Sequence, residues 1–471
     1  MFLEKVDKPM PDRTLRALRS LLNGVDWHDA QTDMLQFKSA ANVLPTALPI
    51  GPLAAAAIAA TGLAADKLRQ IRGGRSQRIG VDMRAATLAM ASSNYLRVDG
   101  RPVKSWDPIT GYYATRDGWV YLHGNFAHLR DGLLQLFKVP NDHAALSAAL
   151  TTWSAADVEN AAGTRGLCAV AVRDAKTWAA HPQAQATATL PLIEISRIGN
   201  APSQPAGNGT RPLSGVRVLD LTRVIAGPMA GRTLAEHGAT VLLASAPHLP
   251  SIESLVIDTG LGKYATTANL DTPEGVATLR RLAGSADVFL NSYRPGALAD
   301  RGFSAAAMTK LRPGMVYVNI SAFSTAGPWA MRRGYDTLVA AATGLTWAGE
   351  DTVKPARLPC QPLDYLTGYL AAFGAMIALR RRALEGGSWE VTLSLERTAA
   401  WIREMTNTLG YESTQPAQAP AESDLDDLYA ELPSVFGRLR FLRPVAQLAA
   451  TPAGWDRAPV PLGSDAPQWP S

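Results

Sequence analysis

Cysteine is scarce in this sequence: of 471 residues, only Cys168 and Cys360 carry a thiol. Two thiols cannot build the disulfide framework that stabilises small secreted proteins, so that class is excluded. Few thiols are typical of the reducing cytoplasm, where we expect the protein to reside. The seven histidines show no metal-ligand spacing, since His123 and His128 lack acidic or thiol partners nearby in the sequence, and we expect no metal.

Long apolar runs and dense basic runs are also missing. The longest apolar run, residues 53–65, consists mostly of small side chains, whereas a membrane span needs about 20 residues. Residues 1–20 mix acids and bases without an apolar core, so we expect a soluble protein without a signal peptide. Lys and Arg exceed Asp and Glu by 46 − 41 = 5. This small excess suits an anionic ligand such as a nucleotide phosphate and argues against nucleic acid as a partner.

The chain is long enough for two or three domains, and its composition is that of an ordinary globular protein, with 47% hydrophobic and 18% charged residues. Two segments rich in Pro, Gly and polar residues predict linkers. The predicted parts are an N-terminal helical segment with one copy of a repeat (1–94), a small α+β domain (95–198), a linker (199–212), a larger domain (213–410), a second linker (411–427) and a C-terminal return segment (428–471).

The larger domain alternates short β-branched runs with helical stretches. Residues 216–221, 239–245, 287–292 and 315–321 predict strands, and the helix at 272–286 starts with a Thr N-cap followed by Pro. This alternation predicts an α/β fold, a Rossmann-like parallel sheet with helices on both faces. Ligands in such sheets bind beyond the carboxyl ends of the strands, so binding residues are expected in the loops that follow them.

The sequence contains an internal repeat. Residues 49–74 align without a gap to residues 362–387, and seven of the 26 positions are identical, including the closing Gly-Gly. Two Ala-rich helices could match by composition alone, but the shared Pro and the strand-like run after each copy favour a duplication. Asp364 in the second copy aligns with Gly51 in the first, so a role for this carboxylate belongs to one copy.

Four motifs follow one another in the larger domain: PLSGVRVLDLTRVIAGPMAGRTLAEHGATVL (212–242), GLGKYATTANLDTPEG (260–275), SYRPGAL (292–298) and LPCQPLDYLTGYLAAFGAMIAL (358–379). Together they resemble the class III CoA-transferases, the family of formyl-CoA transferase, carnitine CoA-transferase and α-methylacyl-CoA racemase. DGWVYLHGN (117–125) is similar to the family's small domain. That domain comes later in ordinary members, so we predict a rearranged chain in which the first copy lost its nucleotide-fold half and the second its small domain.

The resemblance implies that Asp364 is the catalytic nucleophile of a CoA-transferase. Its carboxylate would form a mixed anhydride with the acyl group and then a thioester with coenzyme A, which is a substrate here. The start of a helix, where Asp364 is expected, favours the ionised carboxylate. The resemblance also implies coenzyme A contacts at Val224, Ile225, Ala226, Gly227, Lys263, Ser292, Tyr293, Arg294 and Arg301.

Two alternatives remain open at this point. A racemase of the same family needs two acid/base groups, and racemases place a His where this chain has Tyr335 in a Gly-Tyr-Asp step. Tyr is a poor base near neutral pH, and Asp336 is expected to serve the fold. The other alternative is a catalytically degenerate CoA-binding protein. The expected partners are an acyl-CoA and a small carboxylic acid, and the resemblance implies a homodimer.

Overall fold

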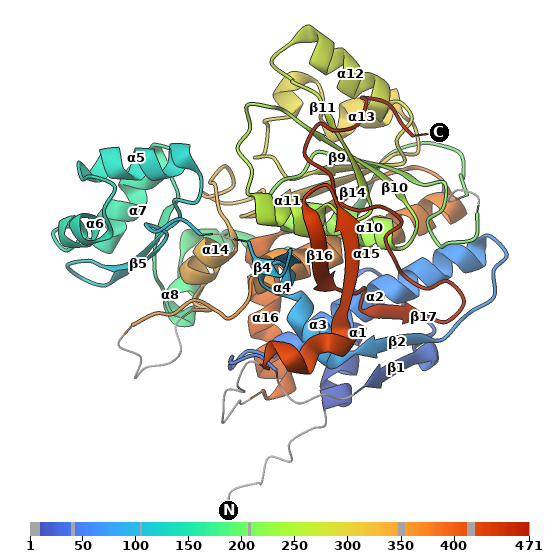
Figure 1. Cartoon of the computed structure of the whole chain (residues 1–471), viewed down its shortest axis with the longest axis horizontal. Helices are drawn as coiled ribbons and strands as arrows, with labels where there is room; N and C mark the ends of the chain where they lie inside the picture. The colour runs from blue at the N-terminus through green and yellow to red at the C-terminus, as the bar shows by residue number, and fades with distance from the viewer. Residues whose placement is uncertain are drawn as a thin grey trace, which may run out of the picture.

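The computed structural model describes residues 10–38, 43–103, 106–205, 209–346, 354–411 and 420–470. Parts of both predicted linkers, residues 206–208 and 412–419, lie outside these ranges. Figure 1 shows a small domain on one side of a large sheet and an N-terminal unit packed below that sheet.

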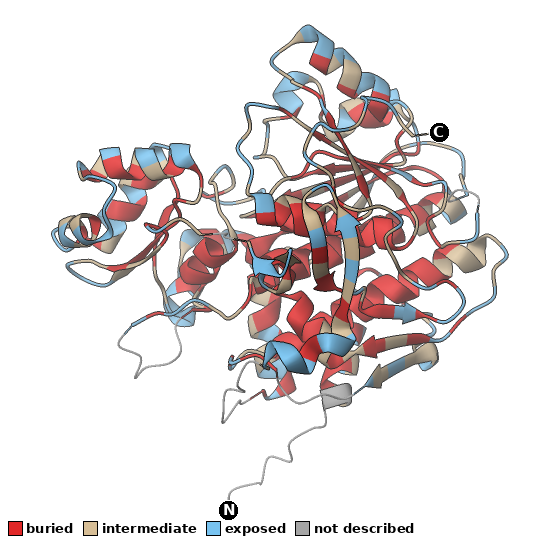
Figure 2. Ribbon diagram, viewed as in Figure 1, coloured by how far each residue is buried: buried red, intermediate tan, exposed pale blue. Residues whose placement is uncertain are grey.

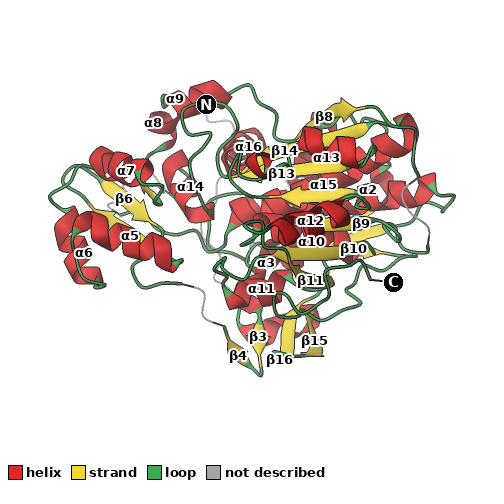
Figure 3. Cartoon of the chain, turned by 90° about the horizontal axis from the view of Figure 1, so that it is seen from above, coloured by secondary structure: helices red, strands yellow, loops and turns green. Residues whose placement is uncertain are grey.

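The core of the larger domain is a seven-stranded sheet, ordered β11-β10-β9-β12-β13-β14-β8 and seen from above in Figure 3. Its strands are β8 (Glu194–Gly199), β9 (Arg217–Asp220), β10 (Thr240–Ser245), β11 (Lys263–Thr267), β12 (Val288–Asn291), β13 (Val316–Ser321) and β14 (Ser388–Ser394). All neighbours are parallel except β8, which pairs antiparallel with β14. The predicted α/β class is confirmed. The final strand of the region assigned to the small domain adds the antiparallel edge, which sequence patterning did not predict.

The order of these strands reverses between β9 and β12. The chain runs from β9 outward to β10 and β11, then returns to β12 on the other side of β9. Loops that leave neighbouring strands in opposite directions open a crevice at the carboxyl edge of the sheet. The loops after Asp220 and after Asn291 flank this crevice, and the Arg223 N–H donates to Ser292 Oγ across it at 3.2 Å.

The helices of this domain are α10 (Ala226–Glu236), α11 (Glu253–Thr259), α12 (Pro273–Ala283), α13 (Ala305–Leu311), α14 (Asp336–Thr343), α15 (Pro362–Glu385) and α16 (Leu395–Leu409). α10, α12, α13, α15 and α16 pack on the sheet, whereas α11 packs on α10, and α14 packs on α15, α16 and β7. The Thr272 side chain caps α12 by accepting the Gly275 N–H at 3.1 Å, as its sequence predicts. By length and hydropathy α15 could cross a membrane, but its apolar window is entirely buried in the fold. Figure 2 shows it as a core helix.

The small domain combines an antiparallel sheet with short helices. Its strands are β5 (Gly111–Ala114), β6 (Trp119–Leu122) and β7 (Ala169–Ala171), and its helices are α5 (Ala127–Phe137), α6 (His143–Leu150), α7 (Ala155–Thr164), α8 (Ala175–Ala179) and α9 (Pro182–Thr187). β5 and β6 form a hairpin around the Arg-Asp-Gly turn expected from the sequence. The loop after β6, α7 and α9 all contact the larger domain.

The N-terminal unit contains α1 (Met10–Gly24), η1 (Thr32–Met34), β1 (Leu35–Lys38), α2 (Ile50–Ile71), β2 (Ile79–Asp82), α3 (Met83–Ala89) and α4 (Ser92–Tyr95). The return segment adds η3 (Glu422–Leu428), β15 (Tyr429–Ser434), β16 (Gly437–Leu442) and β17 (Ala446–Leu448). β15 and β16 extend a sheet with β3 (Arg97–Val98) and β4 (Arg101–Pro102), and β17 pairs with β2. Residues 429–448 therefore return to the N-terminal unit.

The two repeat copies have matching surroundings. Each helix, α2 or α15, leads to a strand and then to a helix capped by the side chain at the end of that strand, Asp82 or Ser394. β2 lies between a parallel neighbour, β1, and an antiparallel one, β17. β14 likewise lies between parallel β13 and antiparallel β8. α2 and α15 also pack on each other. This correspondence is what a duplication predicts.

Candidate active site

The site is built around the first turn of α15. Asp364 is its third residue and is 6% exposed. Asp336, the first residue of α14, lies beside it and is also buried. Asp336 Oδ2 accepts the backbone N–H groups of Leu363 at 2.7 Å and Asp364 at 3.0 Å. Two of the N–H groups left free at the helix start are thereby satisfied by Asp336, which agrees with the structural role expected for it.

Close packing of α10 against α15 brings the loop after β9 to Asp364. Gly368 lies one turn after Asp364, and a Cβ there would stand 2.6 Å from Met229 Cβ and 2.7 Å from the Ala226 carbonyl oxygen. A side chain at this position would force the helices apart. The glycine thus sets how near the start of α10 comes to the carboxylate.

Asp364 lies in a cavity of about 40 Å³ whose walls come from several parts of the chain. The loop before α10 contributes Val224 and Ile225, and α4 of the N-terminal unit contributes Ser93 and Asn94. The remaining lining residues come from the small domain, from Ile252 and Leu255, and from the starts of α14 and α15: Trp106, His123, Asn125, Tyr335, Asp336, Thr337 and Gln361.

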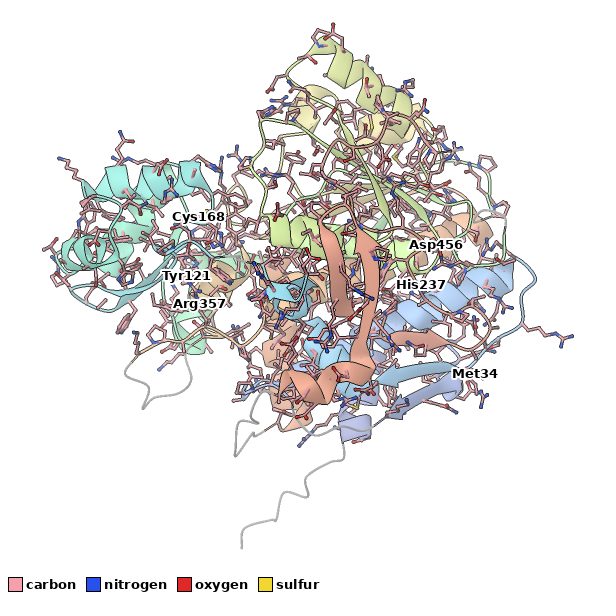
Figure 4. All side chains as sticks on the ribbon, in the orientation of Figure 1. Met34, Tyr121, Cys168, His237, Arg357 and Asp456 are labelled. Carbon is pink, nitrogen blue, oxygen red and sulfur yellow. The ribbon has the colours of Figure 1, made fainter. Side chains whose placement is uncertain are left out.

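The small domain contributes an aromatic stack to this cavity. The His123 ring lies on the Tyr335 ring at a centroid distance of 4.1 Å and an angle of 14°. Burial, with the positive charge of Arg357 second, lowers the pKa of His123 to about 3. Arg357 also stacks on Trp106, with its guanidinium 4.4 Å from the ring centroid. Figure 4 shows Arg357 on the small-domain side of the molecule, near Tyr121. Because its pKa is lowered to about 3, His123 is uncharged at neutral pH.

A wider cleft of about 520 Å³ adjoins the cavity, and Val224 and Tyr335 line both. The cleft is rich in basic and ring side chains, namely Arg223, Arg294, Arg332, Arg333, His128, His248, Phe126 and Tyr293. Ser292, at the crevice of the sheet, lines it too. A basic cleft at this edge can hold a phosphorylated ligand while the ligand's far end enters the cavity.

Val224 stands at the junction with φ = 73°, a left-handed conformation that is costly for a β-branched residue. Its neighbours hold it there: the Arg223 N–H bonds Ser292, and the Thr222 N–H and Oγ1 donate to Asp220 Oδ1 at 2.9 and 2.5 Å. Backbone strain of this kind is concentrated at binding and catalytic sites.

Replacing Val224 with Gly should relieve this strain. Release of about 1–3 kcal/mol of strain is opposed by about 0.5–1 kcal/mol of extra chain entropy in the unfolded state, together with lost apolar contacts. We therefore expect V224G to change the free energy of unfolding by less than about 1 kcal/mol. The control is I225G: Ile225 is buried and has a negative φ, so this variant should lower the free energy of unfolding by more than about 2 kcal/mol. Urea unfolding of both variants tests this, and equal losses would contradict it.

The pKa values of the two carboxyl groups of the site, Asp336 and Asp364, are both raised. Burial raises the pKa of Asp336 to about 7, although two N–H groups donate to it. Burial and the adjacent charge of Asp336 raise the pKa of Asp364 well above its usual range. The sequence suggested that the helix start would favour ionised Asp364. In the structure, burial and Asp336 instead favour the protonated form of Asp364. The N–H groups at the helix start donate to Asp336, and the helix dipole alone contributes only about 0.3–1 kcal/mol.

Replacing Asp336 with Asn tests this coupling. Asn keeps an oxygen that can accept the two N–H groups but removes the like charge, so the pKa of Asp364 should fall. A raised pKa keeps Asp364 protonated at low pH, so a reaction needing its carboxylate rises as pH increases. We expect the rising limb of kcat/KM against pH to move to lower pH in D336N. An unmoved or upward-shifted limb would contradict the coupling.

The other predicted contacts divide into two groups. Val224 and Ile225 line the cavity, and Val224, Ser292, Tyr293 and Arg294 line the cleft, so the structure brings these together. The rest, Ala226, Gly227, Lys263 and Arg301, line neither of these spaces.

The structure gives a physical reason why each of these four residues lines neither space. Lys263 is 2% exposed, and its Nζ bonds Asp220 Oδ2 at 2.8 Å and the Pro228 carbonyl at 2.7 Å, so it serves the core rather than a phosphate. Arg301 pairs with Asp271 at 2.7 Å on the surface. At Gly227 a Cβ would lie 2.3 Å from Thr222 Cβ, so the glycine is required by packing of the loop. Ala226 is buried at the start of α10.

Several residues of the cavity and the cleft were not predicted. His123, Arg223, Arg333 and His128 all lie in or beside motifs quoted above, but nothing in their local patterns assigns them to a site. Arg333 and His128 bridge the two domains, with 3.1 Å between Nη1 and Nε2. Within the described ranges, no group of three His, Cys, Asp or Glu side chains could hold a metal ion.

Residues 213–436 match the family described as CoA-transferase family III. The chain is 34% identical over 219 residues to the acetyl-coenzyme A transferase nodX of Hypoxylon pulicicidum, covering 44% of this chain and 36% of that protein. It is 31% identical over 235 residues to the probable fatty acyl-CoA transferase Rv3272 of Mycobacterium tuberculosis, covering 46% and 59%. A crystal structure of Rv3272 aligns with a TM-score of 0.40 at 30% identity, over 43% of this chain and 60% of that one.

The chain is also 33% identical over 181 residues to the succinyl-CoA:glutarate CoA-transferase of Mus musculus, covering 36% of this chain and 41% of that protein. It thus spans about half the length of these curated relatives.

Proposed function

We propose, from the match of residues 213–436 to CoA-transferase family III, that this protein moves coenzyme A between an acyl-CoA and a free carboxylic acid, with Asp364 as nucleophile. The observation that carries the proposal is the position of Asp364. It lies in a small cavity that adjoins an arginine-rich cleft, with Val224 and Tyr335 lining both. The cleft suits the phosphates of coenzyme A, and the cavity suits the thioester and a small acyl group.

In the proposed reaction the Asp364 carboxylate attacks the thioester carbonyl and expels coenzyme A thiolate, giving a mixed anhydride. The thiolate then attacks the Asp364 carbonyl, which forms an aspartyl-CoA thioester and releases the first acid. The incoming carboxylate reverses these two steps and leaves as the new acyl-CoA. No net proton is exchanged, so the site needs a carboxylate and a shielded cavity rather than an acid/base pair.

The racemase alternative is less well supported. Racemisation requires groups that take up and release protons near neutral pH. Burial lowers the pKa of His123 to about 3 and raises that of Tyr335 beyond its ordinary value. Neither ring of the stack is therefore suited to proton exchange. A CoA-binding protein without activity would leave the buried Asp364 carboxylate beside the cleft without a role.

Trapping with hydroxylamine tests the proposal. The protein is incubated with acetyl-CoA or succinyl-CoA plus hydroxylamine, and peptides are analysed by mass spectrometry. The expected result is a hydroxamate on the peptide containing Asp364, absent in D364A. Solvent deuterium incorporation at the α-carbon without labelling would favour the racemase. The absence of both would leave a binding protein.

We also propose that the protein forms a homodimer and resides in the cytoplasm. Both thiols are buried and unpaired, which suits a reducing compartment. Light scattering measures the assembly directly: a mass twice that of the chain supports the homodimer, and a monomer contradicts it.

A further inference from the structure

A second small cavity adjoins the one that holds Asp364, and the proposed reaction gives it no role. It has a volume of about 50 Å³, and most of the side chains that line it are apolar. Three residues, Val224, Ile252 and Leu255, line both cavities, so their side chains stand between the two spaces. Truncating one of these side chains would join the cavities.

One face of α11 lines the second cavity. Ile252, just before the helix, is followed by Leu255, Val256 and Thr259 at the i+3, i+4 and i+7 positions, which share one helical face. Leu255 is 7% exposed, and α11 packs on α10 and on α4. Packing of the helix on these two neighbours therefore holds Leu255 between the cavities.

The cavity at Asp364 has room for only a short acyl group. One water molecule requires about 10–15 Å³ of such space, so a cavity of about 40 Å³ holds three or four atoms of similar size. The wall toward α11 is apolar, whereas hydroxyl or amide groups line other parts of the cavity, from Ser93, Asn94, Asn125, Thr337 and Gln361. A longer apolar chain therefore extends most favourably toward α11, where it meets Leu255.

Resting on the proposed function, we propose that Leu255 and Ile252 limit the length of the acyl group, and that the protein transfers coenzyme A between acyl groups of about two to four carbons. The adjoining cleft is taken up by coenzyme A itself, so a longer tail has no room on that side. Such a tail would hold the thioester carbon away from the Asp364 carboxylate, and a displacement of about 1 Å costs about 10²-fold in rate.

Truncation of Leu255 tests this limit. Single-turnover release of coenzyme A is measured with acetyl-CoA, butyryl-CoA and octanoyl-CoA. We expect wild type to release coenzyme A from octanoyl-CoA at least about 10²-fold more slowly than from butyryl-CoA. L255A joins the two cavities, so the ratio of the octanoyl-CoA rate to the butyryl-CoA rate should rise at least about tenfold. L311A, an exposed Leu on α13, is the matched control and should keep the wild-type ratio.

Filling the second cavity distinguishes the acyl chain from coenzyme A as its occupant. Val256 lines this cavity but neither the cavity at Asp364 nor the cleft. V256F places a ring in the second cavity, so adding it to L255A should abolish the gain with octanoyl-CoA. In V256F alone, calorimetry should give a dissociation constant for free coenzyme A within about threefold of wild type. A loss of about tenfold or more would assign the second cavity to coenzyme A and overturn the proposal.

The outcomes separate this inference from the proposed function. If no acyl-CoA releases coenzyme A or labels Asp364, the proposed function fails, and the length limit fails with it. If acetyl-CoA labels Asp364 but wild type uses octanoyl-CoA as fast as butyryl-CoA, or folded L255A keeps the wild-type ratio, only the length limit is overturned. Circular dichroism shows whether L255A is folded. If it is not, I252A opens the same wall and carries the same expectation.

Discussion

Replacing Asp364 with Asn is expected to lower kcat for CoA transfer by at least about 10⁴-fold, because the nucleophile is lost and no second carboxylate is aligned to replace it. Asp336 is the nearest candidate, but its Oδ2 is engaged by the N–H groups of Leu363 and Asp364. The first repeat copy offers Gly51 at the equivalent position. The measurement is steady-state transfer from succinyl-CoA to a dicarboxylic acid.

Acyl-CoA binding should survive in D364N, since the cleft that suits coenzyme A is lined by other residues. Calorimetric titration should give a dissociation constant within about threefold of wild type. Asp131, an exposed residue on α5 that pairs with Arg130, provides the control D131N, which should retain full activity. Residual transfer above one percent in D364N would show that another group forms the covalent intermediate.

Loss of the Lys263 ammonium is expected to be the most damaging change to stability. In K263M, Asp220 stays in the core at 0% exposure without its 2.8 Å partner, and an uncompensated buried charge costs about 3–5 kcal/mol. Burial lowers the pKa of Lys263, and the charge of Asp220 and its hydrogen bond oppose that shift. The free energy of unfolding in urea measures the loss.

The double variant D220N/K263M separates charge from packing. Asn keeps an oxygen for the Thr222 N–H but carries no charge, so the double variant should be more stable than K263M alone. A double variant less stable than K263M would show that the unpaired charge of Asp220 is not the cause of the loss of stability in K263M.

The sheet and the helix start that carries Asp364 could be predicted from sequence because both depend on local patterns. Strand residues 216–221 and 315–321 are short β-branched runs between turns, and the structure places β9 and β13 within them. The position of Asp364 near a helix start follows from Pro362 and the repeat. The fold class and the start of α15 were therefore accessible without coordinates.

The electrostatics of the site were not accessible, because they depend on residues far apart in sequence. Asp336 takes the N–H groups of a helix that begins 26 residues later, which reverses the expected effect of the helix on Asp364. The pairing of His123 with Tyr335 joins two domains. Lys263 lies in one of the motifs quoted in the sequence analysis, residues 260–275. Its ion-pair partner, Asp220, is 43 residues away in the sequence and becomes its neighbour only through the order of the strands. Such pairings arise from tertiary packing.

The packing of α2 on α15 has a consequence for biogenesis. α2 is buried from Ile50 to Asp66, yet its partner helix begins at Pro362, about 290 residues later. At about 5–20 residues per second, a ribosome takes about 15–60 seconds to supply it. During this interval a long apolar helix is present without its partner. We expect nascent chains of this protein to depend on holding chaperones, and aggregation to be the main loss when synthesis stalls before α15.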